Sequence, residues 1–245
     1  MMRIGAVLYI IFFLTGFNLP DDNWITIDMQ EYDKIITKAE SFFKNNSYAM
    51  TYKMQSFKSH AENVPHDTQT GKTIISGKNY YSNFLGIKTV QNKSYKLLID
   101  SIEKSILITN PIDQSEYKPL IENYKIFKTN FSSIKKLNTI TGSKIEMLFK
   151  EKLKIKKIIL ELDKDGLITK TVSFLNISVS DNPMNKNAVK SKPRIETSFF
   201  NYKKNEKYDY KTYFDESKYI SIKNGKVTPT EKFKNFRIND TRIKR

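Results

Sequence analysis

The chain contains no cysteine among its 245 residues. Disulfide bonds, thiolate nucleophiles, cysteine-ligated metal sites and a lipid anchor on an N-terminal cysteine are therefore excluded. A chain of this length can still bury one continuous hydrophobic core. We expect the stability of the fold to come from that core alone.

Arginine is scarce, because it supplies five of the 42 basic residues in a chain of formal net charge +16. Readout of nucleic acids favours arginine, whose planar guanidinium group binds phosphates and guanine edges in pairs of hydrogen bonds. We therefore expect no nucleic-acid partner. A lysine-rich face instead favours an anionic membrane surface.

The motifs of the common catalytic and metal sites are missing. No G-x-S-x-G occurs, and Gly77 and Gly86 form no phosphate-binding loop. His60 and His66 are the only histidines, and their spacing matches no standard zinc site. The sequence DKDG at 163–166 lacks the glutamate of a calcium loop and is typical of a hairpin turn. We expect no enzymatic activity, no catalytic residue, no metal and no cofactor.

One hydrophobic run stands out at the N-terminus, IGAVLYIIFFL at residues 4–14, directly after Arg3. It is shorter than the roughly 20 residues that a membrane-spanning helix needs. Its position and length predict a secretory signal peptide over residues 1–17, with cleavage close to Gly16. The alternative is a buried strand or helix. We expect export to the periplasm of a Gram-negative envelope and a single domain over residues 24–245.

Two stretches have the periodicity of amphipathic helices. Asp28 and Glu31 are spaced as a capping box. Apolar residues then recur every three or four positions, at Tyr32, Ile35, Ile36, Ala39, Phe42 and Phe43. A second helical pattern covers about 113–131.

Most of the remaining chain alternates with period two, as at Tyr48–Met54. Short turns separate many of these stretches, and strands joined by short turns must pair antiparallel. The stretch Tyr208–Phe214 is also expected to be a strand. The fold class predicted is α+β and mainly β, a curved antiparallel half-barrel of about 10–11 strands closed by two or so helices.

This order of elements resembles the outer-membrane lipoprotein carrier (LolA-like) superfamily, in particular its exported, Bacteroidetes-type members. The likeness is carried by the opening helix leading into Tyr48–Met54, by YKLLIDSIEKSILITNP at 95–111, by the strands over Ile134–Asn176 and by KYISIKNGKVTPTEKFKNFRINDTR at 218–242. The resemblance implies an incomplete barrel with a hydrophobic concave face that binds a lipid or an acylated protein. The family's carriers hold an arginine that controls acyl release. Arg194 and the three arginines after it all lie late in the chain, so none is assigned to that role.

The candidate ligand-binding residues are large apolar side chains of the predicted strands. Methionine fills irregular space and suits variable hydrophobic ligands. We expect a hydrophobic cavity lined by Met50, Tyr52, Met54, Leu97, Ile99, Met147, Phe149 and Phe174. The same pattern fits a filled core, in which case the chain would be a structural or assembly protein of the cell envelope without a ligand. We expect a monomer in either case.

Overall fold

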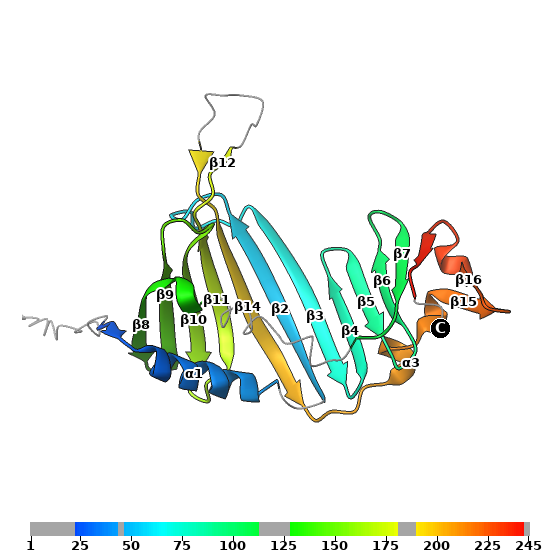
Figure 1. Cartoon of the computed structure of the whole chain (residues 1–245), viewed down its shortest axis with the longest axis horizontal. Helices are drawn as coiled ribbons and strands as arrows, with labels where there is room; N and C mark the ends of the chain where they lie inside the picture. Colours follow the sequence, from blue (N-terminus) through cyan, green and yellow to red (C-terminus); the bar gives the residue numbers. More distant parts are fainter. Residues whose placement is uncertain (1–22, 44–46, 113–127, 181–189, 243–245) are drawn as a thin grey trace, which may run out of the picture.

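One large sheet dominates the fold (Figure 1). The structure is a computed structural model and describes residues 23–43, 47–112, 128–180 and 190–242. The strands of this sheet lie in the order β1-β8-β9-β10-β11-β14-β2-β3-β4-β5-β6-β7-β17. Their bounds are β1 Ile25–Thr26, β2 Ser47–Phe57, β3 Asp67–Ser76, β4 Asn79–Phe84, β5 Ile87–Gln91, β6 Lys96–Asp100, β7 Ser105–Thr109, β8 Phe131–Thr139, β9 Gly142–Phe149, β10 Ile155–Asp163, β11 Ile168–Leu175, β14 Arg194–Lys204 and β17 Arg237–Asp240.

The remaining elements are short, apart from one helix. The two small hairpins are β12 Val179–Ser180 with β13 Lys190–Ser191, and β15 Ile220–Lys223 with β16 Lys226–Pro229. The helices are α1 Met29–Ser41 and α3 Tyr210–Tyr213, with 3₁₀ turns η2 Lys128–Asn130, η3 Glu216–Lys218 and η4 Glu231–Phe233.

The architecture confirms a mainly β fold whose sheet stays open. Neighbouring strands of the large sheet pair antiparallel, except that β17 runs parallel to β7. The expected 10–11 strands are too few, because 13 strands form the large sheet alone. Residues 113–127 of the second predicted helix lie outside the described residues, and Phe131 begins β8 instead. The prediction of a strand over Tyr208–Phe214 is wrong, since this stretch contains α3.

Helix α1 forms where its sequence predicts. The side chain of Asp28 caps it by accepting a hydrogen bond from the backbone N–H of Glu31 at 2.8 Å. Tyr32, Ile36 and Ala39 are buried on one face of the helix, against the sheet. The carboxylate of Glu31 accepts a hydrogen bond from Lys136 on β8 at 3.0 Å, so it ties the helix to the sheet.

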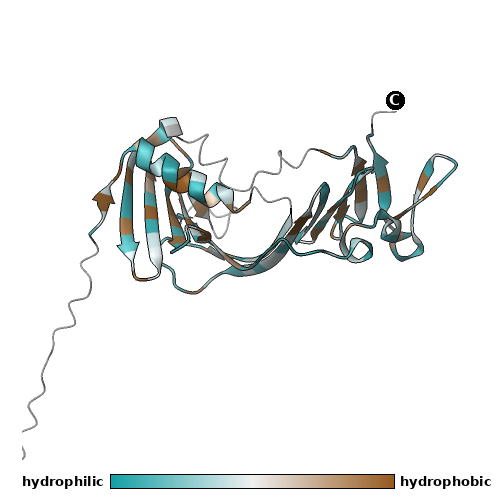
Figure 2. Ribbon diagram, turned by 90° about the horizontal axis from the view of Figure 1, so that it is seen from below, coloured by the Kyte–Doolittle hydropathy of each residue, from teal (hydrophilic) through white to brown (hydrophobic). Residues whose placement is uncertain are grey.

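The two larger hydrophobic cores of the described residues lie on opposite faces of the sheet, and a third, smaller cluster joins Ala49 and Ile74 to Phe214. The first lies between α1 and strands β8 to β11, β14 and β2, and contains the fully buried Ile145, Met147 and Leu160. The second joins β5, β6 and β7 to the C-terminal segment and contains Tyr219 and Ile220. Figure 2 shows the sheet curved, with α1 on the concave side at one end and the C-terminal hairpin outside the curve at the other.

Candidate functional site on the concave face

Strand register assigns each side chain to the concave or the convex face. Met50 packs in the core beneath α1 and therefore lies on the concave face. Alternation along β2 places Tyr52 and Met54 on the same face. Ala49, one residue away, packs on the convex face with Phe214 of the C-terminal segment.

The eight residues predicted to line a cavity divide between the two faces. A row of cross-strand partners crosses the convex face from β2 to β7: Ala49, Ile74, Tyr81, Val90, Leu97 and Ile108. Ile99, two residues beyond Leu97, lies on the same convex face and in the second core. Phe174 also faces the convex side, because it pairs through Arg194 with Phe57 of β2.

The other five predicted residues share the concave face. Met50, Met147 and Phe149 are packed in the core under α1, with relative exposures of 9% or less. Tyr52 and Met54 are only half-buried, and Tyr52 packs against the edge of this core. The structure therefore places Tyr52 and Met54 at an accessible surface and the other three in a filled core.

The middle of the concave face is uncharged, although the chain carries a net charge of +16. We call this surface the central concave face and define it by the concave positions of β14, β2, β3, β4 and β5: Ile195, Thr197, Phe199, Tyr48, Met50, Tyr52, Met54, Ser56, Gln69, Gly71, Thr73, Ile75, Tyr80, Ser82, Phe84, Ile87, Thr89 and Gln91. On these five strands, charged concave positions occur only at strand ends, at Asp67 and Lys204.

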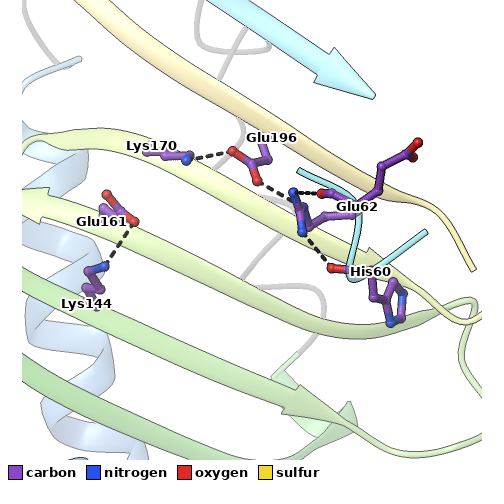
Figure 3. A network of polar contacts seen from close by, with 7 residues as sticks. His60, Glu62, Lys144, Glu161, Lys170 and Glu196 are labelled. Atoms are coloured by element: carbon purple, nitrogen blue, oxygen red, sulfur yellow. Dashed lines mark hydrogen bonds and ion pairs between the residues drawn. The ribbon is translucent and has the colours of Figure 1, made fainter. Parts of the chain in front are cut away.

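The convex face of neighbouring strands carries ion pairs instead (Figure 3). Lys144 pairs with Glu161 across β9 and β10 at 3.4 Å, and Lys170 pairs with Glu196 across β11 and β14 at 2.6 Å. Solvated pairs of this kind are ordinary on the water-facing side of a sheet. The ion pairs of these strands therefore lie on the convex face.

The side chain of Arg194 makes its contacts on the convex side. Its guanidinium donates to the backbone oxygens of His60 at 2.6 Å and Glu62 at 2.8 Å, pairs with Glu196 and lies over the ring of Phe57. These contacts fix the loop between β2 and β3. An arginine so placed does not reach the central concave face.

Aromatic rings dominate the accessible part of the central concave face. The rings of Tyr52 and Phe84 meet edge to face with centroids 5.0 Å apart, and Phe199 lies 6.4 Å from Tyr52 on the other side. Both Tyr52 and Phe84 are half-buried, and Ile87 at the rim is 41% exposed. This arrangement provides an apolar surface that a flexible hydrocarbon chain can contact.

Four hydroxyl groups of this surface, those of Tyr52, Thr73, Tyr80 and Ser82, lie on the adjacent strands β2, β3 and β4, and only Tyr52 among them is predicted from the sequence. Thr73 and Ser82 are cross-strand partners, and their hydroxyl groups lie near enough to the phenol groups of Tyr52 and Tyr80 to act on the pKa of both. Burial raises the pKa of Tyr52 and of Tyr80. The alternation in NYYSNF puts aromatic and polar side chains on both faces of β4, so it gave no signal for which of them face inward.

Gly71 makes this cluster possible. A β-carbon at this position would lie 2.4–2.7 Å from the ring atoms and hydroxyl of Tyr52. The phenol of Tyr52 therefore lies against the backbone of β3 at Gly71, with its hydroxyl near Thr73 and Ser82. A glycine within a strand often marks such a close approach.

The histidines and the DKDG turn have local roles. His60 contacts the backbone oxygen of Leu175 at 2.9 Å and meets the Phe174 ring edge to face. It therefore packs against the end of β11 and is not fully solvated. Asp163 accepts hydrogen bonds from the backbone of Asp165 and Leu167, which closes the turn. Within the described ranges, no group of three or more metal-ligating side chains occurs.

No helix among the described residues is long and apolar enough to cross a membrane. The predicted signal peptide lies outside the described residues.

Comparisons with protein families and with curated proteins find no match. Among solved structures, the chain is similar to an uncharacterized conserved protein from Thermus thermophilus, with 8% identity over 86% of this chain and 99% of that one and a TM-score of 0.44. It is also similar to a DUF1329 family protein from Desulfovibrio piger, with 10% identity, 77% and 97% coverage and a TM-score of 0.33.

A LolA superfamily protein from Nitrosomonas europaea is a third similar structure, with 13% identity, 76% and 98% coverage and a TM-score of 0.31. It comes from the family that the sequence resembles. These TM-scores are too low for any property of the three proteins to be transferred to this chain.

Proposed function

We propose that the chain is an exported envelope protein that binds the hydrocarbon chain of a lipid or of a lipid-modified protein on its central concave face. The observation that carries this proposal is the half-buried, uncharged surface around Tyr52, Met54 and Phe84, next to strands that carry ion pairs on the opposite face. A group of large apolar side chains that stay partly exposed on one surface is typical of a surface that binds a partner.

The energetics of an acyl chain suit such a surface. Each methylene removed from water contributes about 0.8 kcal/mol. Ten buried methylenes would therefore provide about 8 kcal/mol, from which the cost of ordering the ligand is subtracted. A single chain should therefore bind more weakly than the Kd of about 1 μM that 8 kcal/mol alone would give.

A pair of adjacent substitutions tests the proposal. Met54→Glu places a carboxylate on the central concave face, whereas Gln55→Glu places the same group on the convex face one residue away. We expect Met54→Glu to weaken binding of a fluorescent acyl probe by about tenfold or more, because an apolar chain would have to desolvate the charge. Gln55→Glu should bind as the unmodified chain does.

Native mass spectrometry of the purified protein, before and after organic extraction, supplies a second measurement. Recovery of lipid that extraction removes would support the proposal. Equal probe binding by both variants, or a protein that carries no lipid and binds no probe, would contradict it.

A further inference from the structure

We infer that the hydroxyl groups of Tyr52, Thr73, Tyr80 and Ser82 form a neutral polar subsite that binds the ester or amide carbonyl of an acyl ligand. This inference rests on the proposed function and specifies the class of ligand. It makes the chain selective for acyl groups in ester or amide linkage over free fatty acids.

The cluster has the geometry of a built site. Its four members come from three adjacent strands, β2, β3 and β4. Thr73 is only 6% exposed, and its partner Ser82 is half-buried, so the two anchor the floor. The phenol of Tyr52 reaches them only because Gly71 leaves room for its ring.

The chemistry of the cluster matches an uncharged acceptor. A hydroxyl group both donates and accepts hydrogen bonds, so it can turn its proton toward a carbonyl oxygen. Tyrosine ionises near pH 10, and burial raises the pKa of Tyr52 and of Tyr80 further, so both phenols are protonated donors at physiological pH. Carbonyl oxygens accept such bonds without bringing a charge into the site.

A free carboxylate would fit poorly. On the five strands of the central concave face, the charged concave positions are Asp67 and Lys204 at strand ends, outside the hydroxyl cluster. An anion beside Thr73 would therefore lose its hydration without gaining a cation. Neutral acyl compounds carry no such cost.

The surroundings of the cluster suit the rest of an acyl ligand. Phe84 lies on one side of the Tyr52 ring and Phe199 lies on the other. Met54, which is half-buried, lies next to Tyr52 along the same face of β2. A carbonyl held at the hydroxyl groups would leave its hydrocarbon chain on these apolar side chains.

The experiment compares one fluorescent chain in two forms, parinaric acid and its methyl ester, at about pH 8, where the acid is ionised. The full-length protein should bind the ester about tenfold more tightly than the acid. At about pH 4 the acid becomes protonated, and its affinity should approach that of the ester. The affinity of the ester should not change between these two conditions.

Variants separate recognition from packing. Tyr52→Phe and Ser82→Ala each remove one hydroxyl group and should weaken ester binding by about fivefold, while leaving binding of the ionised acid nearly unchanged. Thr51→Val is the matched control, since Thr51 is the neighbour of Tyr52 on β2 and faces the convex side. It should bind both compounds as the unmodified chain does.

The outcomes are distinguishable. If both compounds bind equally well to the unmodified chain and to Tyr52→Phe, the proposed function stands and the subsite is overturned, because the hydroxyl groups then satisfy only one another. Tighter binding of the ionised acid than of the ester would overturn the subsite as well. If neither compound binds, the proposed function fails and the subsite fails with it.

Discussion

Asn92 is the residue whose side chain joins the β5–β6 turn to the C-terminal segment. It is 2% exposed, and its amide nitrogen donates to the Tyr210 hydroxyl, to the backbone oxygen of Phe214 and to the Glu216 carboxylate. Its amide oxygen accepts from the backbone of Ser94 and Tyr95. Every hydrogen-bonding position of this buried amide is therefore used.

We predict that Asn92→Ala lowers the free energy of unfolding by about 2–3 kcal/mol, because it removes the five hydrogen bonds of a buried amide, one of them to the backbone oxygen of the buried Phe214. Urea denaturation followed by circular dichroism would measure the loss. Asn138→Ala, at an exposed position of β8, is the control and should change stability by less than about 0.5 kcal/mol. Equal effects of the two substitutions would show that Asn92 contributes no more than a surface residue.

At this same scale, alternation predicts which residues of one strand share a face, but not which faces of distant strands coincide. Met50, Tyr52 and Met54 share a face, as alternation along a single strand requires. Leu97, Ile99 and Phe174 were grouped with them but lie on the convex face. The missing information was the pairing register, which depends on strand order and on bulges such as that between Phe200 and Lys203.

At the scale of elements, the N-cap of α1 is a local sequence feature whose contribution to stability can be measured. We predict that Asp28→Ala lowers the free energy of unfolding by about 1 kcal/mol, since it removes the acceptor for the backbone N–H of Glu31. Lys34→Ala, on the exposed side of the same helix, should leave stability nearly unchanged. Thermal unfolding followed by circular dichroism would compare them. A loss of similar size in both variants would mean that the cap contributes nothing of its own.

Helix α1 was predictable because its cap and its apolar periodicity agree. The predicted strand over Tyr208–Phe214 failed for the opposite reason. Its tyrosines alternate with polar residues, which favours a strand, but the carboxylate of Asp209 accepts hydrogen bonds from the backbone and side chain of Thr212 and begins α3. A single local cap therefore outweighs a weak period-two pattern in a stretch that no strand pairs with.

At the scale of the whole molecule, the sheet is covered on different faces at its two ends. Helix α1 packs on the concave face over β8 to β11, β14 and β2, and the C-terminal segment packs on the convex face, mainly over β5 to β7 and through Phe214 also on β2 and β3. The sequence predicts an open sheet with few helices, and that is confirmed. It does not predict the change of face, because both ends consist of the same apolar alternation and only three-dimensional packing decides which side is covered.

Both cores contain buried tyrosines, so alkaline pH should weaken the whole molecule. Burial raises the pKa of Tyr48 and Tyr202 near the first core, and it raises the pKa of Tyr219 in the second core to about 12. An unfolded tyrosine ionises near pH 10. Above that pH the unfolded state binds fewer protons than the folded state, so the free energy of unfolding falls as pH rises.

We predict that Tyr219 alone accounts for a loss of about 1 kcal/mol between pH 10 and pH 11. Lysine deprotonation acts in the opposite direction over the same range, because it reduces the repulsion within a chain of net charge +16. The decisive measurement is therefore the difference in urea midpoint between the unmodified chain and Tyr219→Phe, taken at several pH values from 8 to about 11.5, since the lysine contribution cancels in it. The variant should lose less stability than the unmodified chain across this range. Parallel pH profiles would show that the Tyr219 hydroxyl ionises as readily in the folded protein as in the unfolded one.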